Sequence, residues 1–320
     1  MLGSSLAFAV MASCIKLASQ YRVPIVQIVF YRGLISVVVI GLFLFKRGIS
    51  FATPHWKAHA QRGIVGFLGT LTYVAAVALL PVPNAVTLNY TSPAFLALIL
   101  LVVHRERPVP LVMLSMAAGL GGIVVLLRPS YDTSQLFGGA VAIASALFAA
   151  LTALNIRALG RLDEPASRAV FYFSLCIAIG ALPWFVLSHP SSLEDEGALY
   201  VLGAGLAGIA GHVMLTLAYQ RGHTMLVSLL GYSQIVFTSV LGMALWNDRP
   251  TLLGWVGMGL VVASGVVATR SATARVNAGA TQLAVMPRRL QRDATEKRGR
   301  VEPPESCAGK RSTSARAKSA

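Results

Sequence analysis

Long apolar segments, separated by short polar turns, occupy the first 270 residues of the chain. Each segment is long enough to cross about 30 Å of hydrocarbon as an α-helix. Prolines such as Pro108 and Pro250 follow several segments closely, where they cannot continue a helix. The pattern therefore predicts an all-α integral membrane protein with ten transmembrane helices, at residues 1–19, 25–45, 63–80, 84–103, 109–127, 136–156, 167–187, 197–219, 224–246 and 251–269.

The apolar pattern occurs twice. A shift of 142 positions places residues 88–128 on residues 230–270 without a gap, and Tyr90 then matches Tyr232. The acidic-Arg-Pro turn of the first half also matches that of the second half, a coincidence much rarer than a Leu or Val match. Duplicated hydropathy of this kind is typical of transporters that are built from two related halves. We expect a first repeat at 1–130 and a second at 131–271.

The Lys and Arg residues between the predicted helices indicate the orientation. One set of loops holds Lys46, Arg47, Lys57, Arg62, Arg105, Arg107, Arg157, Arg161, Arg168 and Arg221. The opposite set holds Arg22, Arg128 and Arg249, together with the acidic run 194–196. Positive loops remain in the cytoplasm, so we expect both termini to be cytoplasmic. Because each half has an odd number of helices, the halves form two inverted five-helix repeats.

Composition supports membrane embedding. Hydrophobic residues make up 55% of the chain, charged residues 12%, and the mean hydropathy is +0.68. A soluble domain carries about 25% charged residues. Cys14, Cys176 and Cys307 are too scattered to predict a disulfide framework or a metal site. The first segment lacks a basic leader and carries Lys16 near its end, which favours a retained helix over a signal peptide.

Ionisable residues within membrane spans usually face a cavity. Arg32 lies about 10 Å into the second span, and we expect it to contact substrate; pairing with a carbonyl or a helix end is the alternative. For Lys16, snorkelling to the interface is favoured over substrate contact. His212 lies in the eighth span, where a hydrogen-bonded packing role is favoured over a proton relay. These three residues are candidates for a site near the midplane.

Neutral polar residues occur at matching places in both halves: Asn89, Tyr90, Ser92, Tyr232 and Gln234. Pro93 follows the first group, and its missing amide proton frees a carbonyl one turn earlier. The pattern predicts a mirrored kink that acts as a gate or as a wall of the binding site. Hydrogen bonding between helices, at about 0.6 kcal/mol per contact, is the alternative role.

Acidic residues avoid the predicted spans. All 12 Asp and Glu residues lie in predicted loops, at helix ends or in the C-terminal segment. No carboxylate is therefore expected at mid-membrane to bind a proton or sodium. Since Arg32 has no expected acidic partner, we hypothesise that the substrate supplies the negative charge through a carboxylate or phosphate. Transport would then be facilitated or exchange-like.

The C-terminal segment differs in character. Residues 271–320 contain eleven Lys and Arg against four Asp and Glu, and long apolar runs are missing from them. This composition predicts a disordered, basic cytoplasmic tail at 272–320. Contact with anionic lipid and a free solvated tail are the alternatives for its role. Nucleic acid is not an expected partner, because the membrane beside the tail already offers an anionic surface.

Several of these features resemble the drug/metabolite transporter (DMT) superfamily, in particular its ten-helix EamA-type branch. The resemblance rests on Lys16 at the end of the first span, on Phe30-Tyr31-Arg32, and on the segment from Asn84 to Pro93 with its second-half counterpart. It extends over about residues 1–270. It implies a central cavity lined by spans 1–4 and 6–9, with spans 5 and 10 at the periphery. Dimerisation through those peripheral helices is also implied.

These inferences lead to one expected function. The chain is predicted to be a secondary transporter of a small polar metabolite, an amino acid or organic anion, acting by alternating access in the inner or plasma membrane. The predicted site comprises Lys16, Tyr31, Arg32, Asn89, Tyr90, Ser92, His212, Tyr232 and Gln234, with Pro93 as a gating kink. No cofactor or metal is expected, and no motif of an enzyme is found. An accessory membrane protein and a lipid flippase are the alternatives.

Overall fold

The structure is a computed structural model that describes residues 1–80, 82–103, 105, 110–127, 136–188, 195–247 and 251–285. Within these residues all regular secondary structure is helical. The chain divides into one unit at Met1–Ala272 and another at Thr273–Ala320. The helices are α1 Leu2–Gln20, α2 Ile25–Lys46, α3 Trp56–Leu79, α4 Val82–Asn89, α5 Ser92–Val102, α6 Pro110–Leu127, α7 Leu136–Arg161, α8 Ala166–Leu187, α9 Asp195–Arg221, α10 Thr224–Leu230, α11 Ser233–Trp246 and α12 Leu252–Val285.

Eight helical segments in the described part of the chain are long and apolar enough to cross a membrane. They are Leu2–Gln20, Ile25–Lys46, Trp56–Leu79, Asn84–Val102, Leu136–Arg161, Ala166–Leu187, Glu196–Arg221 and Thr224–Trp246. Two shorter apolar helices, Pro110–Val125 and Leu252–Val267, lie where the other two spans are expected. The prediction of a multi-pass, all-helical membrane protein is therefore confirmed.

Two of the spans are interrupted at the places where the sequence predicts kinks. The first interruption, at Tyr90 and Thr91, separates α4 from α5; the second, at Gly231 and Tyr232, separates α10 from α11. Pro93 is buried in the first turn of α5. Amide groups in the first turn have no partner within the helix, so the missing amide proton of proline costs no hydrogen bond there. The helix thus restarts at the proline instead of bending around it.

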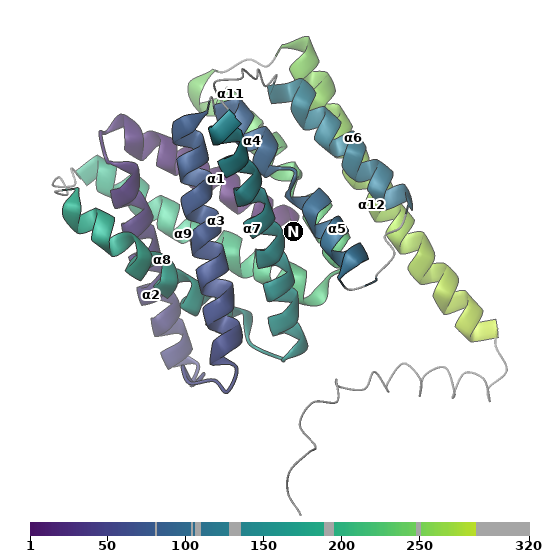
Figure 1. The fold of residues 1–320 in the computed structure, drawn as a ribbon, viewed down its shortest axis with the longest axis horizontal. Coiled ribbons are helices and arrows are strands. Elements are labelled where there is room, and N and C mark those ends of the chain that lie inside the picture. Colours follow the sequence, from purple (N-terminus) through teal and green to yellow (C-terminus); the bar gives the residue numbers. More distant parts are fainter. Residues whose placement is uncertain are drawn as a thin grey trace, which may run out of the picture. The chain divides into compact units, whose positions relative to one another are not determined.

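The long helices pack in a defined set of pairs (Figure 1). Helix α3 contacts α7 and α8, while α9 contacts α1 and α2. Helix α2 contacts α8, α1 contacts α11, and α7 contacts both α4 and α5. Helix α6 approaches α12 closely, because a Cβ added at Gly122 would lie 2.7 Å from the carbonyl oxygen of Gly257. Small residues allow such close approach of membrane helices.

Two boundaries differ from those predicted. Helix α3 begins at Trp56, well before residue 63, so Arg62 lies inside a helix and the prediction that places it in a loop is wrong. Helix α12 continues to Val285, so the first residues of the predicted disordered tail are helical. Residues 271–285 are rich in Ala and contain no Pro, which favours helix. Residues 286–320, His104, Arg128 and the two acidic-Arg-Pro turns (106–108 and 248–250) lie outside the described residues.

Candidate functional site

A pocket lies among α2, α8 and α9, three of the helices that the family resemblance expects to line a cavity. Its lining residues are Arg32, Gly33, Ser36, Phe173, Ser174, Ile177, Gly208 and His212. Only about 10 Å³ of it can hold the centre of a water molecule, which is room for about one water. The described conformation is therefore narrow at this point, and a metabolite would need the helices to move apart.

Arg32 contributes a positive charge to this pocket. Its Nη1 lies 3.2 Å from the sulfur of Met11, a weak acceptor, while the hydroxyl of Ser36 donates to the Arg32 carbonyl at 2.8 Å. In the described part of the chain no carboxylate lies within 4 Å of the guanidinium. Arg32 thus lines the pocket without a carboxylate partner among the described residues, and its contact with substrate stays a prediction.

His212 lies on the opposite wall of the pocket, between two aromatic rings. The ring of Phe8 is 4.9 Å from the imidazole and that of Phe173 is 4.8 Å away, both in edge-on arrangements. The Nδ1 atom is buried and has no hydrogen-bond partner among the described residues. The contacts of His212 are thus aromatic, whereas the sequence favours a hydrogen-bonded role.

Arg62 is a buried arginine near the half-buried Arg32, and it is missing from the set predicted from sequence. Its side chain is only 2% exposed, and its guanidinium carbon lies 4.2 Å from the centre of the Phe173 ring. Its Nη1 has no hydrogen-bond partner in the described part of the chain. Hydropathy placed the helix boundary just after Arg62, but His59 and Arg62 share the inward face of α3 one turn apart. That inward periodicity is the signal that could have revealed it.

Arg32, Arg62 and His212 form what we call the basic group. Arg32 and His212 line the same pocket, and Phe173 contacts both Arg62 and His212. The three residues come from three helices, α2, α3 and α9. The acidic residues with described side chains, Asp163, Glu164 and Glu196, all lie at helix ends. The basic group is therefore an uncompensated positive charge within the helical bundle.

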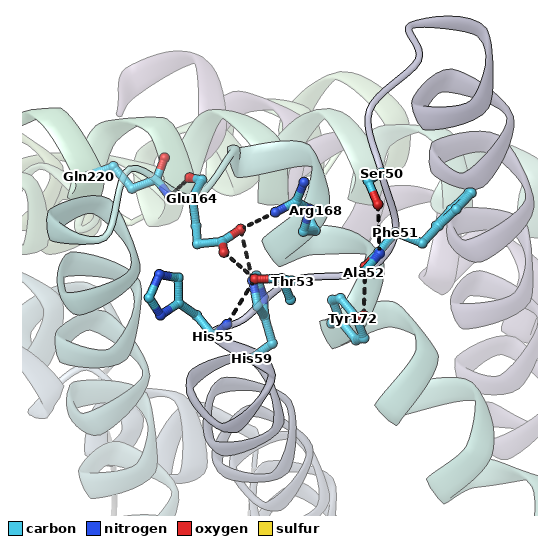
Figure 2. A network of polar contacts seen from close by, with 10 residues as sticks. All are labelled: Ser50, Phe51, Ala52, Thr53, His55, His59, Glu164, Arg168, Tyr172 and Gln220. Carbon is cyan, nitrogen blue, oxygen red and sulfur yellow. Dashed lines mark hydrogen bonds and ion pairs between the residues drawn. The ribbon is translucent and has the colours of Figure 1, made fainter. Parts of the chain in front are cut away.

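A second polar region lies at one end of the bundle, and we call it the Glu164 cluster (Figure 2). Glu164 is 6% exposed and lies in the turn between α7 and α8. The Thr53 hydroxyl donates to its Oε1, Arg168 Nη1 donates to its Oε2 at 2.7 Å, and His59 Nε2 lies 3.2 Å from Oε2. Burial alone would raise the pKa of Glu164, but these hydrogen bonds outweigh it and hold the pKa below its usual range.

The Glu164 cluster joins three connections of the chain. Gln220, near the end of α9, donates its side-chain amide to the Glu164 carbonyl at 3.0 Å. The loop before α3 is held by the Tyr172 hydroxyl, which donates to the Phe51 carbonyl at 2.8 Å, and by the His55 amide, which donates to Thr53 Oγ1 at 3.0 Å (Figure 2). These loops are among those that the Lys and Arg distribution assigns to the cytoplasmic side.

Lys16 and Tyr31 do not line the pocket. Lys16 Nζ lies 4.0 Å from the centre of the Trp246 ring, at the end of α11. Tyr31 packs edge-on against Phe185 at 5.5 Å. The position of Lys16 fits the anchoring role that the sequence favours, because its helix ends at Gln20. For both residues, contact with substrate stays a prediction.

The remaining predicted residues gather around the two helix interruptions. Tyr90 and Tyr232 meet each other, with ring centres 5.9 Å apart. The side-chain amide of Asn89 donates to the Ser145 hydroxyl on α7 at 2.9 Å. Ser92 and Gln234 are half-buried and lie just after the interruptions. The structure therefore divides the predicted site into the pocket with Arg32 and His212 and a separate tyrosine contact between the two halves.

Known transporters are similar to this chain over most of its length. The pseudopaline exporter CntI of Pseudomonas aeruginosa is 29% identical over 271 residues, covering 84% of this chain and 94% of that protein. The riboflavin transporter of Brucella anthropi is 23% identical, with 81% of this chain and 94% of that protein covered. Solute carrier family 35 member G1 of Homo sapiens is 25% identical, with coverage of 75% and 70%. These three relatives are transporters by name.

The fold and the family profile agree with these relatives. A protein of known crystal structure superimposes with a TM-score of 0.71 at 22% identity, covering 85% of this chain and 97% of the other, which shows a common fold. The profile of the EamA-like transporter family matches residues 1–128 and 136–270, nearly all of the helical region. The predicted resemblance to the DMT superfamily is therefore confirmed, and the chain is a multi-pass membrane transporter that belongs to the EamA-like transporter family.

Proposed function

We propose that this protein is a secondary transporter of a small polar metabolite that carries a carboxylate or phosphate group, such as an amino acid or an organic anion. The observation that carries the proposal is Arg32, which lines the pocket and has no carboxylate within 4 Å in the described part of the chain. An uncompensated charge within a membrane is costly and is retained where a ligand uses it. The pseudopaline and riboflavin transporters among its relatives support small-molecule transport.

The proposed mechanism is alternating access between two inverted five-helix repeats. The packing pairs support a two-fold relation, because exchanging the halves converts α1–α9 into α7–α3, α2–α9 into α8–α3, and α1–α11 into α7–α5, and all six pairs are present. Matching residues Tyr90 and Tyr232 contact each other, as residues beside a two-fold axis do. The Lys and Arg distribution supports opposite orientations of the halves, with both termini in the cytoplasm of an inner or plasma membrane.

The described conformation fits a closed state at the Glu164 end. The pocket is narrow, and the Glu164 cluster ties the loop before α3 to the α7–α8 turn and to the end of α9. In an alternating-access cycle these contacts would separate when the transporter opens toward that side. We assign that side to the cytoplasm on the basis of the charge distribution.

The test is uptake by sealed liposomes that contain the purified protein, with a pool of labelled amino acids and organic acids. We expect saturable uptake that Arg32→Gln abolishes. Lys46→Gln is the matched control, because Lys46 is exposed at the far end of the same helix. Uptake of neutral or cationic compounds alone would contradict the assigned substrate charge. A lack of uptake of any compound in the pool would contradict the proposed substrate class.

A further inference from the structure

The basic group is spread along the depth of the bundle. Helices α3 and α8 both begin at the Glu164 end, so Arg62 lies about 9 Å and Phe173 about 10 Å from that end. His212 lies about 14 Å from the end of α9 at Arg221 on the same side. Arg32 lies about 21 Å from Lys46, where α2 ends on that side. Arg62 is thus positioned between the Glu164 end and the Arg32 pocket.

Phe173 separates Arg62 from the pocket. One side of its ring is occupied by the Arg62 guanidinium, whose carbon lies 4.2 Å from the ring centre, and its edge packs on His212 at 4.8 Å. Phe173 itself lines the pocket, whereas Arg62 does not. A cation–π contact offers about 2 kcal/mol when desolvated, less than the cost of burying an unpaired arginine. The fold alone therefore does not explain why a charge lies here.

Gly66, on the same helix as Arg62, leaves room for the guanidinium. A Cβ added at Gly66 would lie 2.4 Å from Arg62 Nη1 and 2.7 Å from the Phe173 ring. Glycine at this position, one turn after Arg62 on α3, lets both groups occupy the same space. Nη1 is buried and lacks a hydrogen-bond partner among the described residues, so it is available to an anion.

We propose that Arg62 is a second anion-binding position for the transported carboxylate or phosphate, on the path between the Arg32 pocket and the Glu164 end, and that Phe173 closes it in this conformation. The inference rests on the proposed function of Arg32. When the Phe173 ring moves off the guanidinium, Arg62 accepts the anionic group that Arg32 releases. The substrate charge then has a cationic partner at two depths, which lowers the barrier for an anion to cross the bundle.

The experiment compares binding with transport. Wild type, Arg32→Gln, Arg62→Gln and Arg62→Lys are reconstituted in liposomes and assayed with labelled succinate, citrate, lactate, glutamate and aspartate. Binding of the same five compounds is measured in detergent as the shift that each causes in the thermal midpoint. We expect Arg32→Gln to lose both readouts. Arg62→Gln should keep the shift but lose at least about 10-fold in maximal uptake rate, and Arg62→Lys should recover part of it because the charge remains.

The outcomes separate the two proposals. Normal uptake by Arg62→Gln, with loss in Arg32→Gln, overturns the second position and leaves the proposed function intact. Equal losses in Arg62→Gln and Arg62→Lys, with a lowered thermal midpoint in both, also overturn it, because they indicate a structural role. Failure of the wild type to take up any of the five anions, or normal uptake by Arg32→Gln, overturns the proposed function and the inference with it. Arg62→Met supplies the uncharged variant if the Gln protein does not fold.

Discussion

The charge of Glu164 is compensated by its neighbours in the Glu164 cluster, whereas the charges of the basic group are not compensated. The Glu164 carboxylate receives hydrogen bonds from Thr53 and Arg168 and lies beside His59, so both of its oxygens are occupied. In the basic group, the Arg32 guanidinium has a thioether contact and Arg62 has a ring contact. A compensated charge stabilises a particular packing of helices, whereas an uncompensated one is kept for a ligand.

The two regions can be compared directly, because each contains a residue of helix α3. His59 and Arg62 lie one turn apart on the inward face of α3, and both are nearly inaccessible. One points to a carboxylate and the other to an aromatic ring. The difference predicts that substitutions in the Glu164 cluster lower stability, while substitutions in the basic group lower transport.

The largest expected effect is on transport by Arg32→Met. Loss of a charge-assisted bond to the substrate, worth about 3 kcal/mol, should reduce uptake about 100-fold. The thermal midpoint in detergent should stay level or rise, because a half-buried, unpaired charge is replaced by an apolar side chain of similar length. Uptake in liposomes and thermal unfolding of the same preparation measure both quantities. A fall in stability as large as that of a Glu164 variant would remove the contrast between the two regions.

The next effect is on stability, in Glu164→Gln. The substitution leaves Arg168 and His59 without their carboxylate, and breaking a buried ion pair from one side costs about 3 kcal/mol. Thermal unfolding in detergent should show a lowered midpoint. The matched control is Asp163→Asn, because Asp163 is exposed and its left-handed backbone suits Asn equally well. A control that falls as far as Glu164→Gln would show that the turn, and not the buried charge, determines stability.

Gly66→Ala should lower both thermal stability and uptake. The new Cβ would displace Arg62 Nη1 and the Phe173 ring, and overpacking of this kind costs about 2 kcal/mol. Uptake should fall about 10-fold if Arg62 must hold its place, which corresponds to about 1.4 kcal/mol. Gly69→Ala is the control on the same helix, since its Cβ would lie 3.2 Å from Phe148 Cβ and demands only a small shift. Equal uptake by the two variants would argue against a positioned Arg62.

At low pH, Glu164 should lose part of its contribution to the stability of the fold. Its pKa is held below the usual value, so its stabilising effect is complete above the unfolded-state pKa, about 4.3, and is lost as the pH falls through the lower folded-state pKa. We expect the thermal midpoint of the wild type to drop below about pH 4.3 more steeply than that of Glu164→Gln. Parallel pH profiles for the two proteins would contradict the compensation described for the cluster.

The succession of helices along the chain could be predicted from the sequence, because a segment that crosses the hydrocarbon core must be long and apolar. The interruptions near Tyr90 and Tyr232 were also predictable, since Pro93 and the polar residues mark one of them and the repeat marks the other. Their causes differ, however: the second interruption occurs at Gly231 without a proline. The match of the repeat identified the place correctly although the local chemistry is not the same.

Contacts between distant segments were not predictable. Glu164 was placed correctly in a turn, but its partners Thr53 and Gln220 come from residues far along the chain, and only the packing of α3, α8 and α9 brings them together. Arg62 was misplaced because an average over polar neighbours such as Lys57 hides the inward face of a helix. A single sequence therefore predicts which segments form helices better than it predicts which residue a buried charge contacts.

The smallest expected effect concerns Asn89 and Ser145, two neutral residues that belong to neither region. Asn89 donates to Ser145 at 2.9 Å, so its amide is compensated, although the sequence places it among the substrate contacts. Ser145→Ala and Asn89→Ala should each cost about 0.6 kcal/mol in thermal unfolding and leave the half-saturating concentration for uptake unchanged. If Asn89→Ala raises that concentration and Ser145→Ala does not, Asn89 contacts substrate in another conformation of the cycle. A hydrogen bond in one conformation would then separate structural from ligand-binding residues among charged side chains, but not among neutral ones.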